Sequence, residues 1–275
     1  MVDRAAQNPL AGARLLRSFA SGPQELSITE SANALSETMW RKLGARTLTF
    51  ESVDWVCILK PAGAAVAWAR EWFAPAALAL PLAKLIDQRS QRIAANLVAP
   101  IPSLASHRRD EEASEELLAE RIPLLASTYP MHPDWTTSNV RWLLAHTRNK
   151  ARRGRLYRRV VYEGDGPAIG CYLYYGAPNH IGWVLQILAR PGSADPVLDS
   201  LLDHAHRNGT VALRGRAHPR LMDALLRRRA IFFHRASTLV HSTQPALLEA
   251  MQSGDALVTG LAGEAWTRLI GDRFA

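Results

Sequence analysis

The chain has 275 residues and a formal net charge of +8, because 33 lysines and arginines outnumber 25 aspartates and glutamates. Cys57 and Cys171 are too few for a disulfide framework and lack the spacing of zinc ligands, so we expect a cytoplasmic protein that holds no metal. The longest uncharged apolar run, WFAPAALALPLA, has 12 residues with two prolines, and the first residues lack an apolar segment of secretory length. We therefore expect neither a membrane span nor a signal peptide.

The first 60 residues alternate between helix and strand patterns. In chain order they predict a helix with Asn8 and Pro9 at its start, a strand at 24–30, a helix at 34–43 that ends at Gly44, and a strand at 47–59. This alternation indicates an α/β or α+β protein.

Residues 61–106 differ in composition from their neighbours. They are rich in alanine, contain prolines at 61, 75, 81, 100 and 102, and show no strand-like alternation. We expect a helical connector with breaks, whose apolar side docks on a neighbouring domain or on a second copy of the chain.

From residue 107 the elements follow in a fuller order. Helix patterns at about 112–126 and 137–151 precede strands at LYRRVVYE, AIGCYLYYG and IGWVLQILA. A helix then begins with Asp195 as its cap and ends at Gly209, followed by the strand VALRGRAH, a helix from Pro219, the strand RASTLVHST and a mostly helical tail. The order is thus two helices, three strands, helix, strand, helix, strand.

The opening stretch carries two more specific patterns. Residues on the spacing NxxAxxxYxxxGF are Asn33, Ser36, Trp40, Gly44 and Ala45. Upstream, Gln7 and Gly12 fit Gln/Arg-x-x-Gly-x-Gly/Ala, and a helix follows from Ala13. With the element order, these patterns resemble the GNAT superfamily of acyl-CoA-dependent N-acyltransferases. The resemblance implies a mixed, mostly antiparallel sheet that is flanked by helices and splays around the cofactor.

The resemblance also implies a division into domains. Residues 1–60 resemble the C-terminal half of a GNAT domain, 61–106 are the connector, and 107–275 resemble a complete GNAT-like domain. The first half of the first domain is then expected to be missing from the chain. That would leave an open sheet edge, for the connector, the second domain or a partner chain to cover.

The GNAT resemblance implies acetyl-CoA as co-substrate. Unpaired amides at a helix N-terminus bind a diphosphate, so we expect this role for the loop made of Gln7, Leu10, Ala11, Gly12 and Ala13. In the family, an asparagine at the position of Asn33 bonds the pantetheine arm. Trp40 stands where the family has a tyrosine that protonates the departing thiolate, and an indole is a poor acid. The catalytic residues are therefore unassigned.

The function implied is direct transfer of an acyl group, most simply acetyl, to the amine of a small molecule or peptide. One alternative is a catalytically degenerate GNAT-like regulatory or interaction module. The other is a basic nucleic-acid-associated protein, which only the charge favours.

For several other residues, the sequence favours a structural role over a functional one. The arginine clusters lack interleaved aromatic residues, so a solvated surface is favoured over a nucleic-acid face; they are Arg152, Arg153, Arg158, Arg159, Arg227, Arg228 and Arg229. His204 and His206 are two apart on a helix and are expected at the surface. Tyr172 and Tyr174 share one strand face, where filling the core is favoured over lining a substrate cleft.

Overall fold

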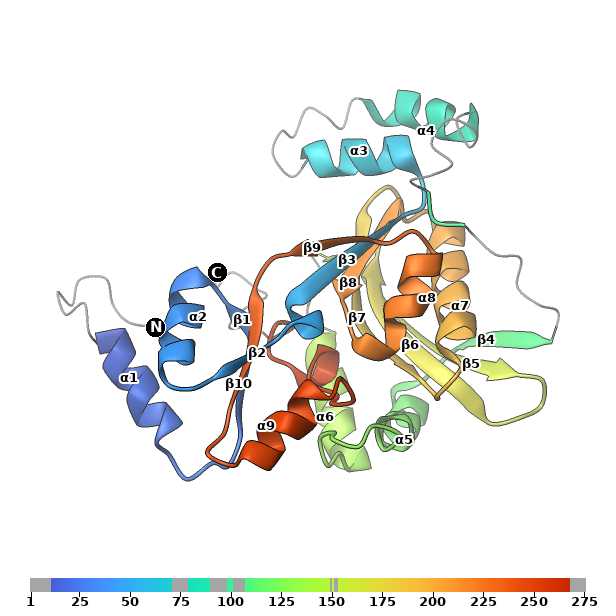
Figure 1. Ribbon diagram of the computed structural model, residues 1–275. Coiled ribbons are helices and arrows are strands. Elements are labelled where there is room, and N and C mark those ends of the chain that lie inside the picture. Colours follow the sequence, from blue (N-terminus) through green and yellow to red (C-terminus); the bar gives the residue numbers. More distant parts are fainter. Residues whose placement is uncertain are drawn as a thin grey trace.

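The computed structural model describes residues 11–70, 79–89, 98–100, 107–148, 150 and 153–267. These residues form a three-stranded sheet and a seven-stranded sheet side by side, with helices around both (Figure 1). Within the described ranges, every helix is too short or too polar to cross a membrane.

The N-terminal segment alternates helix and strand as its patterns predict. Its elements are α1 (Ala11–Ala20), β1 (Ser27–Ala32), α2 (Ala34–Lys42), β2 (Arg46–Leu48) and β3 (Val53–Ile58). The predicted single strand at 47–59 is wrong, because a 3₁₀ turn at Phe50–Ser52 separates β2 from β3. The Ser52 hydroxyl fixes this turn: it donates to the Leu48 carbonyl and accepts from the Thr238 amide.

The remaining elements build the larger sheet and its helices. The strands are β4 (Arg108–Glu112), β5 (Arg155–Glu163), β6 (Ala168–Gly176), β7 (Ile181–Ala189), β8 (Ala212–Arg216), β9 (Ile231–His234) and β10 (Ser237–His241). The helices are α3 (Pro61–Arg70), α4 (Leu80–Arg89), α5 (Glu115–Ala126), α6 (Thr137–Thr147), α7 (Ala194–Arg207), α8 (Met222–Arg227) and α9 (Pro245–Gln252).

The two sheets exchange strands. The larger sheet has the order β4-β5-β6-β7-β8-β3-β9, and the smaller has the order β1-β10-β2. Thus β3, from the N-terminal segment, lies between β8 and β9, while β10, from the C-terminal part, lies between β1 and β2. In both sheets, neighbouring strands are antiparallel except β7 and β8, which are parallel. The predicted fold class, a mixed and mostly antiparallel sheet flanked by helices, is confirmed.

Two hydrophobic clusters sandwich the larger sheet. On one face, α7 packs against β6 residues such as Tyr172 and Tyr174, and on the other, α5 and α6 pack against Cys171 and Leu173. Alternation along β6 sends neighbouring side chains to opposite faces. Both tyrosines fill the core, as predicted. Tyr172 donates a hydrogen bond to Asp110, and the Tyr174 hydroxyl pairs with Nδ1 of His204 at 2.9 Å.

Four predictions in the C-terminal part are wrong. The strands β4 and β9 are not predicted, because all five residues of 108–112 are charged and the helix pattern from Pro219 extends to Phe232. That helix ends at Arg227, and Arg229 then adopts a positive φ of 57°. His204 is buried, and Ser193, not Asp195, is the N-cap residue of α7.

The connector forms helices where the structure describes it. The two helices α3 and α4 stand together at one end of the larger sheet (Figure 1). The Asp87 carboxylate of α4 accepts from the amides of Ala62 and Gly63 in the first turn of α3. Residues 71–78, 90–97 and 101–106 lie outside the described residues. The predicted domain boundaries at 60 and 106 stay predictions, because the exchanged strands join the two ranges in common sheets.

Candidate functional site

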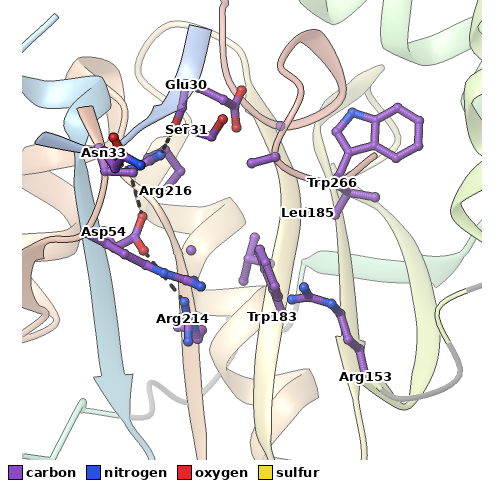
Figure 2. A pocket seen from close by; sticks show the side chains of 16 residues that line it. Glu30, Ser31, Asn33, Asp54, Arg153, Trp183, Leu185, Arg214, Arg216 and Trp266 are labelled. Carbon is purple, nitrogen blue, oxygen red and sulfur yellow. Dashed lines mark hydrogen bonds and ion pairs between the residues drawn. The ribbon is translucent and has the colours of Figure 1, made fainter. Parts of the chain in front are cut away.

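A cavity of about 340 Å³ lies where the two sheets meet. It receives side chains from the end of β1, from β3, β7 and β8, and from the segment after α9 (Figure 2). The residues used below are Glu30, Ser31, Asn33, Asp54, Arg153, Trp183, Leu185, Arg214, Arg216, Arg235 and Trp266. In Figure 2, Glu30 and Asn33 lie on one side, Arg153 lies opposite, and Trp183 lies between them.

The cavity opens where two parallel strands separate. The strands β7 and β8 pair only over their first residues, from Ile181 with Ala212 to Trp183 with Arg214. Beyond this point β7 and β8 no longer pair with each other, and residues of both strands, including Leu185 and Arg216, line the cavity. The sheet therefore splays at this point.

The deeper part of the splay is filled by the chain itself. The amide of Leu261 donates to Oε1 of Gln186 on β7 at 2.9 Å. A Cβ added to Gly260 would lie 2.3 Å from that same Gln186 oxygen and 2.7 Å from the Leu185 carbonyl. A cavity of about 20 Å³ lies beside this contact, lined by residues of the separated strands and by Gly260. Room for a ligand therefore lies on the β1 side of the splay.

Two glutamates bind β1 to the C-terminal segment. The Glu264 amide donates to Oε2 of Glu30, and the Glu30 amide donates to Oε1 of Glu264, each at 3.1 Å. The hydroxyls of Thr29 and Ser31 also donate to Glu264, at 2.6 and 2.8 Å. Because β10 pairs with the other side of β1, this segment of the same chain occupies the outer edge of the strand.

Glu30 is a buried acid on the cavity wall. Its side chain is 3 % exposed, and burial raises its pKa to about 7. The positive charge of Arg216 opposes this rise, and the negative charge of Glu264 adds to it. Near neutral pH, Glu30 therefore exists in both protonation states.

Asp54 and four arginines also line the cavity. Asp54 lies between two of them, with Oδ1 at 3.2 Å from Nη1 of Arg216 and Oδ2 at 3.7 Å from Nη2 of Arg214. Arg216 also donates to the carbonyls of Glu30 and Ala236, which fixes it between the two sheets. The guanidinium carbon of Arg153 lies 3.0 Å from the centroid of the Trp183 ring, and that of Arg214 lies at 5.2 Å.

The predicted cofactor residues are described only in part. Gln7 and Leu10 lie outside the described residues. Ala11, Gly12 and Ala13 form the first turn of α1, with no atom within 4 Å of the place that a Cβ on Gly12 would take. These residues do not line the cavity. Their role stays a prediction.

Asn33 lies where the sequence pattern suggests a functional residue. It is the N-cap of α2, because its Oδ1 accepts the Ser36 amide at 2.9 Å, and it lines the cavity. Trp40, about two turns further on, is 7 % exposed, and its ring lies 6.2 Å from that of Phe19, centroid to centroid, in an edge contact. Trp40 is thus a packing residue between α1 and α2.

Sequence reasoning missed most of the cavity. Arg214 and Arg216 left a signal, since they share one face of an otherwise apolar predicted strand. Glu30, Asp54 and Trp183 left none, because each comes from a different segment. In the described ranges, no three His, Cys, Asp or Glu side chains converge as metal ligands.

The predicted arginine clusters are largely paired within the described residues. Arg227 and Arg228 bind Asp195, and Arg228 also binds Asp199. On the larger sheet, Arg158 binds Glu115 and Arg159 binds Asp110. Much of the positive charge counted in the sequence is therefore already balanced by neighbouring carboxylates.

No family model and no curated protein matches the chain. Among solved structures, it resembles a conserved protein of unknown function from Enterococcus faecalis V583, described as a probable N-acyltransferase, with a TM-score of 0.51 and 14 % identity over 88 % of this chain and 50 % of that one. The chain is also similar to a GCN5-related N-acetyltransferase from Anabaena variabilis ATCC 29413, with a TM-score of 0.49 and 10 % identity over 84 % of this chain and 49 % of that one. A GCN5-related N-acetyltransferase from Kribbella flavida gives a TM-score of 0.49 and 11 % identity over 88 % of this chain and 50 % of that one. This chain spans about half the length of these proteins. Its fold is similar to that of the Enterococcus faecalis protein.

Proposed function

We propose that this protein transfers an acyl group, most simply acetyl, from coenzyme A to an acceptor amine in the cavity beside β1. The GNAT fold suggests acyl transfer in general terms. The observation that carries the proposal is the open cavity at the separation of β7 and β8, which holds both Asn33 and a buried carboxyl group. A fold alone does not define an activity, so the proposal depends on the residues of the cavity.

The N-terminal segment is proposed to hold the cofactor. The amides in the first turn of a helix suit a diphosphate, and among the described residues no atom lies within 4 Å of a Cβ added to Gly12, so that phosphate oxygens can approach the backbone. Asn33 suits the pantetheine arm, since it reaches the cavity wall. The splay of the larger sheet is the poorer choice, because Gly260 and Leu261 fill it.

Glu30 is proposed to take the proton of the acceptor. The amine nitrogen attacks the thioester carbonyl carbon, so that a C–N bond forms and the C–S bond breaks. The proton lost by the amine passes to the ionised Glu30 carboxylate, and coenzyme A leaves as its thiolate. A carboxyl group with a pKa near 7 is suited to this role at neutral pH.

Titration calorimetry with acetyl-CoA, followed by thiol release with a panel of amines, tests the proposal. The sharpest variant is Asn33→Ser, because serine caps a helix about as well as asparagine but is too short to reach an arm in the cavity. We expect acetyl-CoA binding about tenfold weaker in this variant. The matched control is Ser114→Asn at the N-cap of α5, outside the cavity, which should bind normally. Equal binding by all three proteins would reject Asn33 as a cofactor residue.

One observation favours the alternative of a catalytically degenerate module. Trp40 is buried against Phe19 at the place where the family pattern has its tyrosine, so that position offers no acid to the departing thiolate. A protein of this kind would give binding heat with acetyl-CoA and no thiol release with any amine. Thiol release with one amine would reject it.

A further inference from the structure

Two further cavities continue from the candidate site toward α3. One has about 630 Å³ and the other about 270 Å³, and both share Arg214 and Arg235 with the site itself. We call their joint lining the basic groove, defined by Arg70, Arg153, Arg214, Arg235, Trp68 and Trp183. The groove thus leads from the cavity beside Glu30 to the end of the larger sheet.

The charge of the basic groove has one sign. Among the described residues that line these two cavities, the charged side chains are all arginines, and none is a carboxylate. Asp54, in the adjoining site, is shared by Arg214 and Arg216 and so balances one of the two. The guanidinium group of Arg153 lies over the face of Trp183. A concave surface with this charge attracts anions.

The proposed cofactor residues lie elsewhere. Figure 1 shows α1 at the outer side of the smaller sheet, whereas α3, which supplies Arg70, stands at the end of the larger sheet. The phosphates proposed for the start of α1 therefore do not account for the groove.

We propose that the basic groove binds carboxylate or phosphate groups of the acceptor, so that the acceptor is an amine that also carries negative charge. This inference rests on the proposed function and deepens it. The amine lies in the cavity beside Glu30, and the oxyanions lie beside Arg70 and Arg235. Arginine suits both groups, because its planar fork of donors pairs with two oxygens at once. Trp68, which is 50 % exposed, offers an apolar surface beside them.

Three tripeptide amides with the same lysine amine test the charge requirement: Lys-Glu-Glu, Lys-Gln-Gln and Lys-phosphoserine-phosphoserine. Titration calorimetry at low salt should show the acidic or the phosphorylated peptide binding at least about tenfold more tightly than the neutral one. The comparison of the two charged peptides tells carboxylate from phosphate. Raising the salt concentration should narrow the difference. Equal affinity for all three peptides would overturn the inference.

Charge-neutralising variants locate the binding. Arg235 is exposed and Arg70 ends α3, so Arg235→Gln and Arg70→Gln disturb no buried side chain. Each should weaken the charged peptides about tenfold and leave Lys-Gln-Gln unchanged. The control is Arg141→Gln, an exposed arginine on α6 outside the groove. Loss of acetyl-CoA binding, with peptide binding intact, would assign the groove to the cofactor instead.

The binding measurements need no turnover, so they test the anionic acceptor independently of the proposed transferase activity. The expected affinities without thiol release from acetyl-CoA would reject the transferase and leave an oxyanion site. Thiol release with Lys-Gln-Gln as fast as with Lys-Glu-Glu would keep the transferase and reject the anionic acceptor.

Discussion

Glu30 is a buried carboxyl group on the wall of a cavity, and its ionised form is the one that accepts a proton. Because burial favours the protonated form, its pKa rises to about 7, and the base is lost as the pH falls below that value. We expect kcat/KM to rise with pH with a midpoint near 7. Glu30→Gln should remove this rise and lower kcat by about 10²–10⁴-fold.

The measurement is a pH profile of thiol release for both proteins, with acetyl-CoA binding as the control for an intact site. Glutamine keeps the acceptor for the Glu264 amide, so the variant should bind acetyl-CoA normally. A variant with the same pH midpoint and kcat as the native protein would show that another group takes the proton.

His204 is a second buried titratable residue, and it affects stability. Burial, and then the positive charges of Arg159 and Arg207, lower its pKa to about 4. The unfolded chain binds a proton near pH 6.5 that the folded protein does not accept until about pH 4. Stability should therefore be full above pH 6.5 and fall as the pH drops toward 4.

Urea unfolding at a series of pH values checks this prediction. In His204→Gln, the glutamine cannot titrate but can still accept from the Tyr174 hydroxyl. Over this pH range, its free energy of unfolding should change less steeply, by roughly one bound proton. His218, whose burial also lowers its pKa to about 4, should keep the remaining dependence. An unchanged slope would contradict the assignment to His204.

At the scale of elements, the sequence predicts what local chemistry decides. The helix pattern at 34–43 matches α2, and Gly44 follows its end with a φ of 91°, as expected. The strand β4 was missed because pairing with β5 holds five charged residues in extended form, and no local preference signals that. Asp195 was taken as a cap because it precedes a proline, but Arg227 and Arg228 from another helix bind it.

The segment that fills the splay depends on a glycine. Gly260 has a φ of 68°, and a Cβ there would meet the Leu185 carbonyl and the Gln186 side chain. Gly192 has a similar φ of 79° with no atom within 4 Å of such a Cβ, so it is the matched control. We expect Gly192→Ala to lower the free energy of unfolding by about 1–2 kcal/mol through backbone strain alone.

In Gly260→Ala, the same backbone strain is joined by a steric clash of the new Cβ with Leu185 and Gln186. Its cost should exceed that of Gly192→Ala by about 1–3 kcal/mol, measured by urea unfolding. Displacing the segment would also expose it, so limited proteolysis near residue 260 should be faster in this variant only. Equal costs for the two alanine variants would show that the segment yields without resistance.

At the scale of the whole molecule, the cavity results from the strand exchange. The exchange brings β1 and β3, near the start of the chain, against β7, β8 and the segment after α9. Glu30 and Glu264 meet across 234 positions, a separation at which sequence patterns carry no signal. For this reason Asn33 was predictable from a local motif, while Glu30, Asp54 and Trp183 were not.

The exchange also predicts that the two sheets unfold together. Each sheet contains an interior strand from the other half of the chain. Neither half of the chain can therefore unfold without disrupting both sheets. Leu239 on β10 is fully buried against β1 and β2, and Leu239→Ala should cost about 2–5 kcal/mol. Hydrogen exchange should then speed up in β1 and in β6 alike.

The comparison variant is Leu144→Ala on α6, an equally buried leucine in the cluster over the larger sheet. If the halves are coupled, it should also speed up exchange in β1, although it lies outside the smaller sheet. Mass spectrometry of peptides from 27–32 and 168–176 gives both readouts in one experiment. Faster exchange in β1 with unchanged protection in β6 after Leu239→Ala would show that the smaller sheet opens alone, because β10 can then leave without disturbing β3.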